Sequence, residues 1–198
     1  MDALDRTLPT TRRTLGDVDP EQPLDPTSSL TDGLQAFWLP LPRLTGGSKL
    51  YDLCGGPPGE LENGQFWGTD PSRAFPVLDY NGTDQGVSLN RDGVTGANPR
   101  TYSIWIYPTG PEDAKFWSQG QTDVAGSRFD FTVEDPDGDG SAEILFRHFG
   151  GNIRYPGIKP YRWSWVSMVV PDGATHTDDV FVYINGTRKN GTRNAGSD

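Results

Sequence analysis

The stretch that decides the fold runs from Arg73 to Tyr107. It reads RAFPVLDYNGTDQGVSLN over residues 73–90 and, after a loop, TYSIWIY over residues 101–107. The first segment alternates around Asn81-Gly82, a pair typical of a type I′ hairpin turn because both central residues need positive φ. Along the second segment two sets of side chains alternate before Pro108, namely Tyr102, Ile104 and Ile106 against Ser103, Trp105 and Tyr107. The pattern predicts three strands of an antiparallel sandwich.

The composition favours an all-β protein with an aromatic core. The 198 residues include 25 Gly and 17 Pro, which break long helices and suit many turns. Only 33% of the residues are hydrophobic, but they include 6 Trp, 7 Tyr and 9 Phe, whose side chains bury large areas. The net charge of −10 argues against binding to a nucleic-acid backbone, which needs clustered Lys and Arg, and fits a soluble surface or one that attracts cations.

The single cysteine and the N-terminal sequence give little information about the cellular compartment of the protein. Cys54 is the sole cysteine, which forbids an intrachain disulfide and is typical of a small buried residue. No apolar run approaches the length of a membrane span. The N-terminus lacks the basic and apolar regions of a secretory signal, so a chain that starts at Met1 is expected to be made in the cytoplasm.

Residues 1–32 differ in composition from the rest of the chain. They are rich in Thr, Pro and Asp, and their prolines forbid a continuous helix. The segment is either a disordered leader or an extended arm that docks on a protein partner. We favour the arm, because contacts with a partner would offset the entropy lost when a polar segment is ordered.

Residues 33–198 are predicted to form a single β-sandwich. Runs of β-branched and aromatic residues, separated by turn residues, recur about every 10 to 15 residues, as in two packed antiparallel sheets. The longest run, 161–170, is nearly continuous and is expected at the centre of a sheet. Further strands are expected over 34–39, 49–53, 115–118, 128–133, 143–149 and 179–184, the last turning at Asn185-Gly186, and residues 60–64 are expected to turn the chain toward Phe66-Trp67.

Several short motifs follow one another in a set order. They are GLQAFW at 33–38, YDLCG at 51–55, LDYNGTDQGV at 78–87, SIWIYP at 103–108, a Trp-to-Val strand over 163–169 and VYING at 182–186. This ordered set resembles the concanavalin A-like jelly roll in its laminin-G-like (LamG) branch, with Cys54 where that family has Ser. The resemblance covers residues 33 to about 191 and implies a lectin-like, two-sheet jelly roll.

One departure from that family concerns the C-terminal region. Its members usually continue through two further strands, the last of which pairs beside the first, whereas this chain ends at Asp198. A shortened chain, a reduced sandwich or completion by another chain would each account for the difference. An open sheet edge recruits partners, so the resemblance indicates a subunit of an oligomer or larger assembly.

Residues 134–143 contain the Asp-x-Asp-x-Asp-Gly spacing of a calcium loop. The candidate ligands are Asp135, Asp137, Asp139 and Glu143. An EF-hand is excluded, because its twelfth position is Phe146 here and the flanking segments look like strands. The two remaining interpretations are a calcium-capped hairpin and an acidic, solvated turn.

No catalytic motif is evident. The Glu-x-Asp-x-x-Glu strand of jelly-roll glycoside hydrolases is missing, and the pair Glu60 and Glu62 lies in a segment expected to be a turn. His148 and His176, the only histidines, stand in no motif that pairs a nucleophile with a base. We therefore expect a non-catalytic protein.

The tryptophans are the remaining candidates for ligand contact. Trp163 and Trp165 share one face of their strand and, like Trp105, are expected in the core. Trp67 and Trp117 lie nearer to loops and are the better candidates for exposed platforms that bind sugars.

Two functions fit this sequence. The first is a structural subunit, such as a capsid decoration or tail component on the surface of a phage virion, anchored by the N-terminal arm. The second is an extracellular LamG-like adhesion module that binds carbohydrate or protein. A glycoside hydrolase fits less well, because its motif is missing. The architecture favours the structural subunit, with no nucleic-acid or membrane partner.

Overall fold

The computed structural model describes residues 32–40, 47–64, 66–70, 76–89, 91, 93–94, 97–110, 114–120, 129–135, 139–148 and 151–193. These residues form an all-β protein whose strands pair antiparallel. They divide into two compact units, one up to residue 91 and one from residue 92. The arm predicted over 1–32 lies, except for Asp32, outside this part of the chain. No helix in the described segments is long and apolar enough to cross a membrane.

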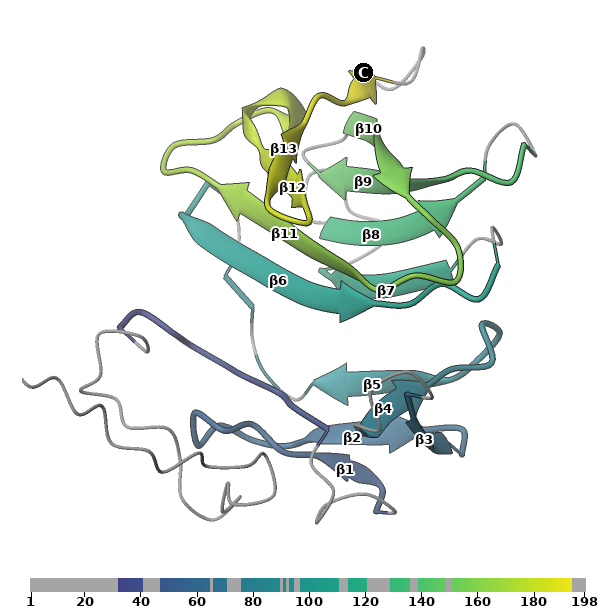
Figure 1. The fold of residues 1–198 in the computed structure, drawn as a ribbon. Helices are drawn as coiled ribbons and strands as arrows, with labels where there is room; N and C mark the ends of the chain where they lie inside the picture. The colour runs from purple at the N-terminus through teal and green to yellow at the C-terminus, as the bar shows by residue number, and fades with distance from the viewer. Residues whose placement is uncertain are drawn as a thin grey trace, which may run out of the picture. The chain divides into compact units, whose positions relative to one another are not determined.

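The first unit contains two small sheets (Figure 1). In one, β2 (Gly59–Glu62) lies between β1 (Lys49–Leu50) and β5 (Gly86–Leu89). In the other, β3 (Phe66–Thr69) pairs with β4 (Pro76–Asp79). Asn63 and Gly64, between β2 and β3, have φ of 61° and 73°, a left-handed pair of the kind that Asn-Gly adopts at low cost.

The hairpin predicted at Asn81-Gly82 does not form. The strands on its two sides belong to different sheets, because β4 pairs with β3 and β5 pairs with β2. Gly82 has a φ of 72°, but Asn81 does not have positive φ, so the turn is not of type I′. The Asn81 carboxamide oxygen instead accepts a hydrogen bond from the Thr83 N–H at 2.9 Å. Pairing with earlier strands has overridden a strong local turn signal.

The strand predicted over 34–39 is reduced to an isolated bridge between Trp38 and Asp52. The fully buried Asp52 carboxylate accepts hydrogen bonds from the backbone N–H groups of Phe37 and Cys54, both at 2.9 Å, and pairs with Arg91 at 3.2 Å. A side-chain acceptor therefore organises this region in place of a strand ladder. Burial, and then the charge of Asp52, raise the pKa of the Cys54 thiol, which keeps it protonated.

The second unit is a sandwich of two antiparallel sheets (Figure 1). The order in the five-stranded sheet is β14 (Thr192–Arg193), β10 (Gly151–Ile158), β9 (Ala142–His148), β8 (Phe129–Glu134) and β7 (Ala114–Gln119). The order in the four-stranded sheet is β13 (Thr187–Lys189), β12 (Phe181–Ile184), β11 (Ser164–Val170) and β6 (Arg100–Ile106). A 3-10 helix, η3 (Thr177–Asp179), precedes β12.

Alternate side chains of both sheets meet in one hydrophobic core. The four-stranded sheet contributes mostly aliphatic residues, and the five-stranded sheet contributes the aromatic ones. Phe146, Val166 and Met168 are among the residues that are completely buried. The antiparallel sandwich expected from the sequence is thus present in this unit, built from the alternation on which the prediction rests.

Most strands predicted for the second unit are confirmed. The strands expected over 115–118, 128–133, 143–149 and 179–184 correspond to β7, β8, β9 and β12. The segment 161–170 forms β11 from Ser164 onward, and β11 lies inside its sheet, between β12 and β6. Asn185 and Gly186, with φ of 53° and 77°, form the predicted turn between β12 and β13.

Strand β10 is the longest of the strands that the sequence prediction missed. Pro156 and Gly157 interrupt its pattern, and Pro cannot donate to a ladder. The register with β9 shifts between Pro156 and Ile158, where Gly157 has a φ of 119°. This irregularity accommodates the proline while Ile153, Tyr155 and Ile158 stay buried.

Candidate functional site

The outer face of the four-stranded sheet carries exposed tryptophans. Trp105 on β6 lies directly opposite Trp165 on β11, and their exposed fractions are 57% and 44%. The ring centroids are 6.0 Å apart and the planes differ by 16°. Two adjacent, half-exposed indoles form an unusually apolar surface for a chain with a net charge of −10, and such surfaces mark contact sites.

These positions show that the predicted core placement of Trp105 and Trp165 is wrong. Both strands have apolar side chains on their two faces, so a period of two does not say which face is buried. In the sandwich the compact Ile106, Val166 and Met168 fill the space between the sheets. The larger indoles are left on the opposite face. Trp163 lies on the face of Trp165, as predicted, and is half-buried.

The exposed aromatic surface extends toward the turn before β11. Tyr107 and Trp163 continue the paired rows, with ring centroids 5.4 Å apart. Tyr161 is 66% exposed and has a φ of 59°, which is strained for a bulky residue and is held by its N–H bond to the Pro108 carbonyl at 2.7 Å. We call Trp105, Tyr107, Trp163 and Trp165 the aromatic strip.

A row of polar side chains runs beside the aromatic strip on the same face. Ser103 on β6 pairs with Ser167 on β11, and their hydroxyl oxygens are 2.5 Å apart. Ser167 pairs in turn with Tyr183 on β12, which pairs with Arg188 on β13. We call these four residues the polar row. It places hydroxyl, phenol and guanidinium groups next to the indoles.

The inner face of β6 is tied to the five-stranded sheet by specific polar contacts. The Tyr102 hydroxyl donates to the Gln119 side chain at 2.6 Å, and burial raises the pKa of this phenol. Arg100 contacts the Nε2 atom of the buried His148 at 2.9 Å. Because a guanidinium can only donate, Nε2 is the acceptor and the His148 proton lies on Nδ1. These contacts hold the strand that displays Trp105.

The two tryptophans proposed from the sequence as platforms lie elsewhere. Trp117 on β7 is half-buried at the margin of the core and packs against Tyr102 with ring centroids 5.1 Å apart. Trp67 on β3 belongs to the first unit, and its indole N–H donates to the Gly47 carbonyl at 2.9 Å. Within the second unit, Trp117 is not part of the aromatic strip.

The acidic loop between β8 and β9 is stabilised in part by its own backbone. Asp135 accepts a hydrogen bond from the Gly140 N–H at 3.0 Å, and Asp139 accepts one from the Ser141 N–H at 2.7 Å. Glu143 lies on β9 and forms an ion pair with Arg154 at 4.0 Å. Asp137 lies outside the described residues, and the described ones contain no group of three or more His, Cys, Asp or Glu able to hold a metal ion.

The glutamate pair and the two histidines considered for catalysis lie on separate elements. Glu60 and Glu62 lie within β2 instead of the expected turn, and Glu60 forms an exposed ion pair with Lys49 at 3.5 Å. His148 is buried in β9, whereas His176 precedes η3. The two histidines thus lie on separate elements.

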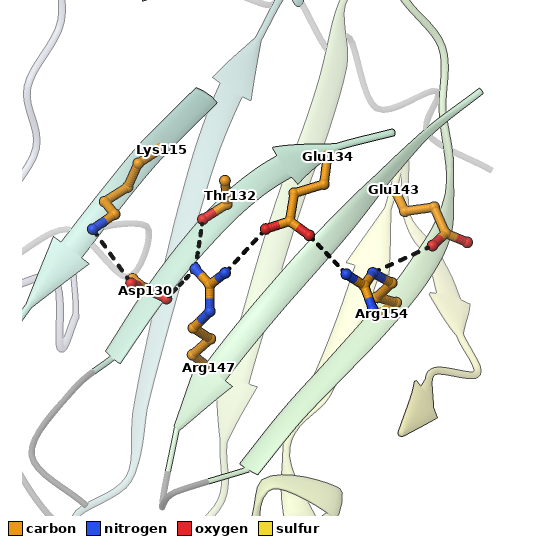
Figure 2. A network of polar contacts seen from close by, with 7 residues as sticks. All are labelled: Lys115, Asp130, Thr132, Glu134, Glu143, Arg147 and Arg154. Carbon is orange, nitrogen blue, oxygen red and sulfur yellow. Dashed lines mark hydrogen bonds and ion pairs between the residues drawn. The ribbon is translucent and has the colours of Figure 1, made fainter. Parts of the chain in front are cut away.

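The outer face of the five-stranded sheet carries a network of ion pairs (Figure 2). Arg147 links the fully buried Asp130 at 3.5 Å to Glu134 at 3.0 Å. Beyond these, Lys115 contacts Asp130 at 3.5 Å and Arg154 contacts Glu134 at 3.0 Å. We call this network the charged ladder; its members are Lys115, Asp130, Glu134, Glu143, Arg147 and Arg154.

Comparison of the chain with models of known protein families, with curated proteins and with solved structures gives no match. The candidate site therefore depends on geometry alone. The sequence signal that could have indicated it is the fully alternating run over residues 101–107. Its two faces are both rich in aromatic or aliphatic residues, which predicts a second contact surface beside the core.

Proposed function

We propose that this protein is a non-catalytic binding subunit of a larger assembly, and that its sandwich contacts carbohydrate through the aromatic strip. The observation that carries the proposal is the exposed, near-parallel pair Trp105 and Trp165 on the outer sheet face. A large exposed apolar surface costs solubility unless it is used for contact.

Carbohydrate is the ligand whose chemistry this face suits best. A sugar ring presents an apolar face of C–H groups and a rim of hydroxyls. Indole and phenol rings cover the apolar face, while a few polar groups orient the rim. Here the aromatic strip supplies the rings, and Ser103, Ser167 and Tyr183 supply hydroxyls one row away.

Binding to an oligosaccharide array tests this proposal. Wild-type protein is expected to bind a defined subset of glycans, and W105A/W165A is expected to lose at least tenfold in affinity, because about 1.4 kcal/mol corresponds to a factor of ten. Tyr51→Ala removes an aromatic side chain of the first unit that is 39% exposed, and it serves as the matched control. Unchanged glycan binding by the double variant would refute the proposal.

A second candidate role, as a structural subunit such as a virion decoration or tail component, is favoured by the edge strand β6. This seven-residue strand ends the four-stranded sheet and carries no charge or proline between Thr101 and Ile106. Native edges are usually protected by such residues, by bulges or by shortness. The opposite sheet ends in β7, which has Lys115 and a register shift, and in the two-residue β14.

Solution mass tests the structural role. An assembly that adds a strand at β6 should give an oligomer in light scattering, and Thr101→Lys, which places a charge on this edge, should shift it toward the 21.7 kDa monomer. Thr187→Lys, an exposed position on the three-residue edge strand β13, is the control. A wild-type monomer at all concentrations would argue against self-assembly through β6.

A further inference from the structure

Arg188 stands out on the proposed carbohydrate face. The side chains that β6, β11, β12 and β13 direct outward are hydroxyl, aliphatic or aromatic, except for this single arginine. Its guanidinium carbon lies 4.1 Å from the centroid of the Phe181 ring, a cation–π contact that holds the group over the sheet.

The guanidinium of Arg188 is available to a ligand. The residue is exposed, and it makes no ion pair with any residue in the described part of the chain. Several other arginines have acidic partners: Arg91 pairs with Asp52, Arg147 with Asp130, and Arg193 with Asp178. Arg162 is likewise exposed and makes no ion pair within the described residues, but it lies in the turn before β11, whereas Arg188 is held over an aromatic ring on the sheet face itself.

The position of Arg188 suits a ligand that also covers the tryptophans. Arg188 lies two strands from β11, and Trp165 lies two residues along β11 from Ser167 in the polar row. Strand spacing and rise then put Arg188 on the order of 12 Å from Trp165, a separation that a short oligosaccharide spans.

We propose that Arg188 makes this face selective for acidic sugars, with the guanidinium binding a carboxylate or sulfate while the aromatic strip covers a neighbouring ring. The inference rests on the carbohydrate-binding function proposed above. A guanidinium binds such groups with paired N–H donors, which adds orientation as well as attraction. The net charge of −10 repels an acidic ligand. This repulsion comes from charges farther away than Arg188, and it is screened beyond about 8 Å at physiological ionic strength.

Calorimetric titration with matched oligosaccharides tests the proposal. The probes are oligogalacturonate, its fully methyl-esterified neutral form, and a sulfated galactan oligomer of equal length. Wild-type protein should bind at least one acidic probe roughly three- to tenfold more tightly than the neutral one, as expected for a charge-assisted contact at an exposed site. The acidic probe that is preferred identifies carboxylate or sulfate as the recognised group.

Variants separate this inference from the proposed function. Arg188→Gln should abolish the preference while retaining binding of the neutral probe, and Arg193→Gln, with the same change in net charge on the other sheet, should keep the preference. W105A/W165A should lose all probes. A preference that survives in Arg188→Gln, or a wild-type protein that favours neither acidic probe, overturns the role of Arg188. Unchanged binding by W105A/W165A overturns the proposed function instead.

Discussion

The two outer faces of the sandwich carry different kinds of side chain. On the five-stranded sheet, long charged side chains pair across strands and cover the surface, so that Asp130 and Leu145 are almost completely buried although they point away from the core. On the four-stranded sheet, the outward groups are aromatic, aliphatic and hydroxyl side chains with the single charge of Arg188, and Trp105 keeps more than half of its surface exposed.

This difference separates a face that stabilises from a face that binds. Charges already paired with one another have little left to offer a ligand, and breaking their pairs costs desolvation. Aromatic rings without a covering layer gain free energy when a partner removes them from water. The comparison therefore predicts that substitutions in the charged ladder change stability, whereas substitutions in the aromatic strip change binding.

Among substitutions on the two outer faces, Arg147→Met is expected to have the largest effect on stability. It leaves the buried Asp130 and Glu134 without their shared cation, and we expect a loss of about 3 kcal/mol in the free energy of unfolding, measured by urea denaturation. Arg193→Met, which removes the exposed pair with Asp178, should cost less than about 1 kcal/mol. Equal losses in the two variants would mean that the charged ladder is no more than a set of surface ion pairs.

Trp105→Ala should have a smaller effect on stability. Because over half of the side chain is already exposed, we expect a loss of about 1 to 2 kcal/mol, below the 3 to 5 kcal/mol expected for the buried Phe146→Ala. Thermal and urea unfolding of the two variants measure this. A loss for Trp105→Ala as large as that for Phe146→Ala would place the indole in the core.

Tyr102→Phe tests the connection between the two sheets beneath the aromatic strip. Loss of the hydroxyl bond to Gln119 should cost about 1 kcal/mol. Because burial raises the pKa of Tyr102 above 10.0, the stability that its neutral form contributes is complete below that pH and is lost as the pH rises through the raised value. The free energy of unfolding of the variant should therefore fall less steeply at alkaline pH than that of the wild type. The same dependence on alkaline pH in both proteins would contradict this.

Calcium is expected to have the smallest effect on the stability of the protein. If the acidic loop binds calcium, the ion would brace the connection between β8 and β9, both of which carry members of the charged ladder. At a calcium concentration equal to Kd the stabilisation would be only about 0.4 kcal/mol, so calorimetric titration is the better measurement. Asp137→Ala plus Asp139→Ala should remove the heat of binding. A wild-type protein that gives no heat would end the calcium hypothesis.

Several features of this molecule follow from local sequence. The alternation over 101–107 predicts a strand, because only an extended chain separates such residues onto two faces. The nearly continuous run over 161–170 also predicts a strand, which forms from Ser164 onward. Asn185-Gly186 predicts its turn because both residues readily adopt positive φ. The candidate calcium loop and the absence of a catalytic motif were also inferred at this level, and they stay predictions.

The aromatic strip shows the limit of that reasoning. Alternation gives two faces but does not assign the core to either of them when both are apolar, and Trp105 is the residue for which this matters most. Likewise, Arg188 is an ordinary exposed arginine in the sequence. Its position over Phe181 and beside Tyr183 depends on strand pairing.

By itself, then, the sequence determined an all-β chain, most of its strands in the second unit and the turn at Asn185-Gly186, because these depend on neighbouring residues. The tertiary structure decided which strands pair and which faces are buried. Asn81-Gly82 is followed by a strand that pairs with β2 instead of β4, and β10 forms despite Pro156. Both outcomes depend on contacts between residues far apart in the chain, whose free energy exceeds that of a single local preference.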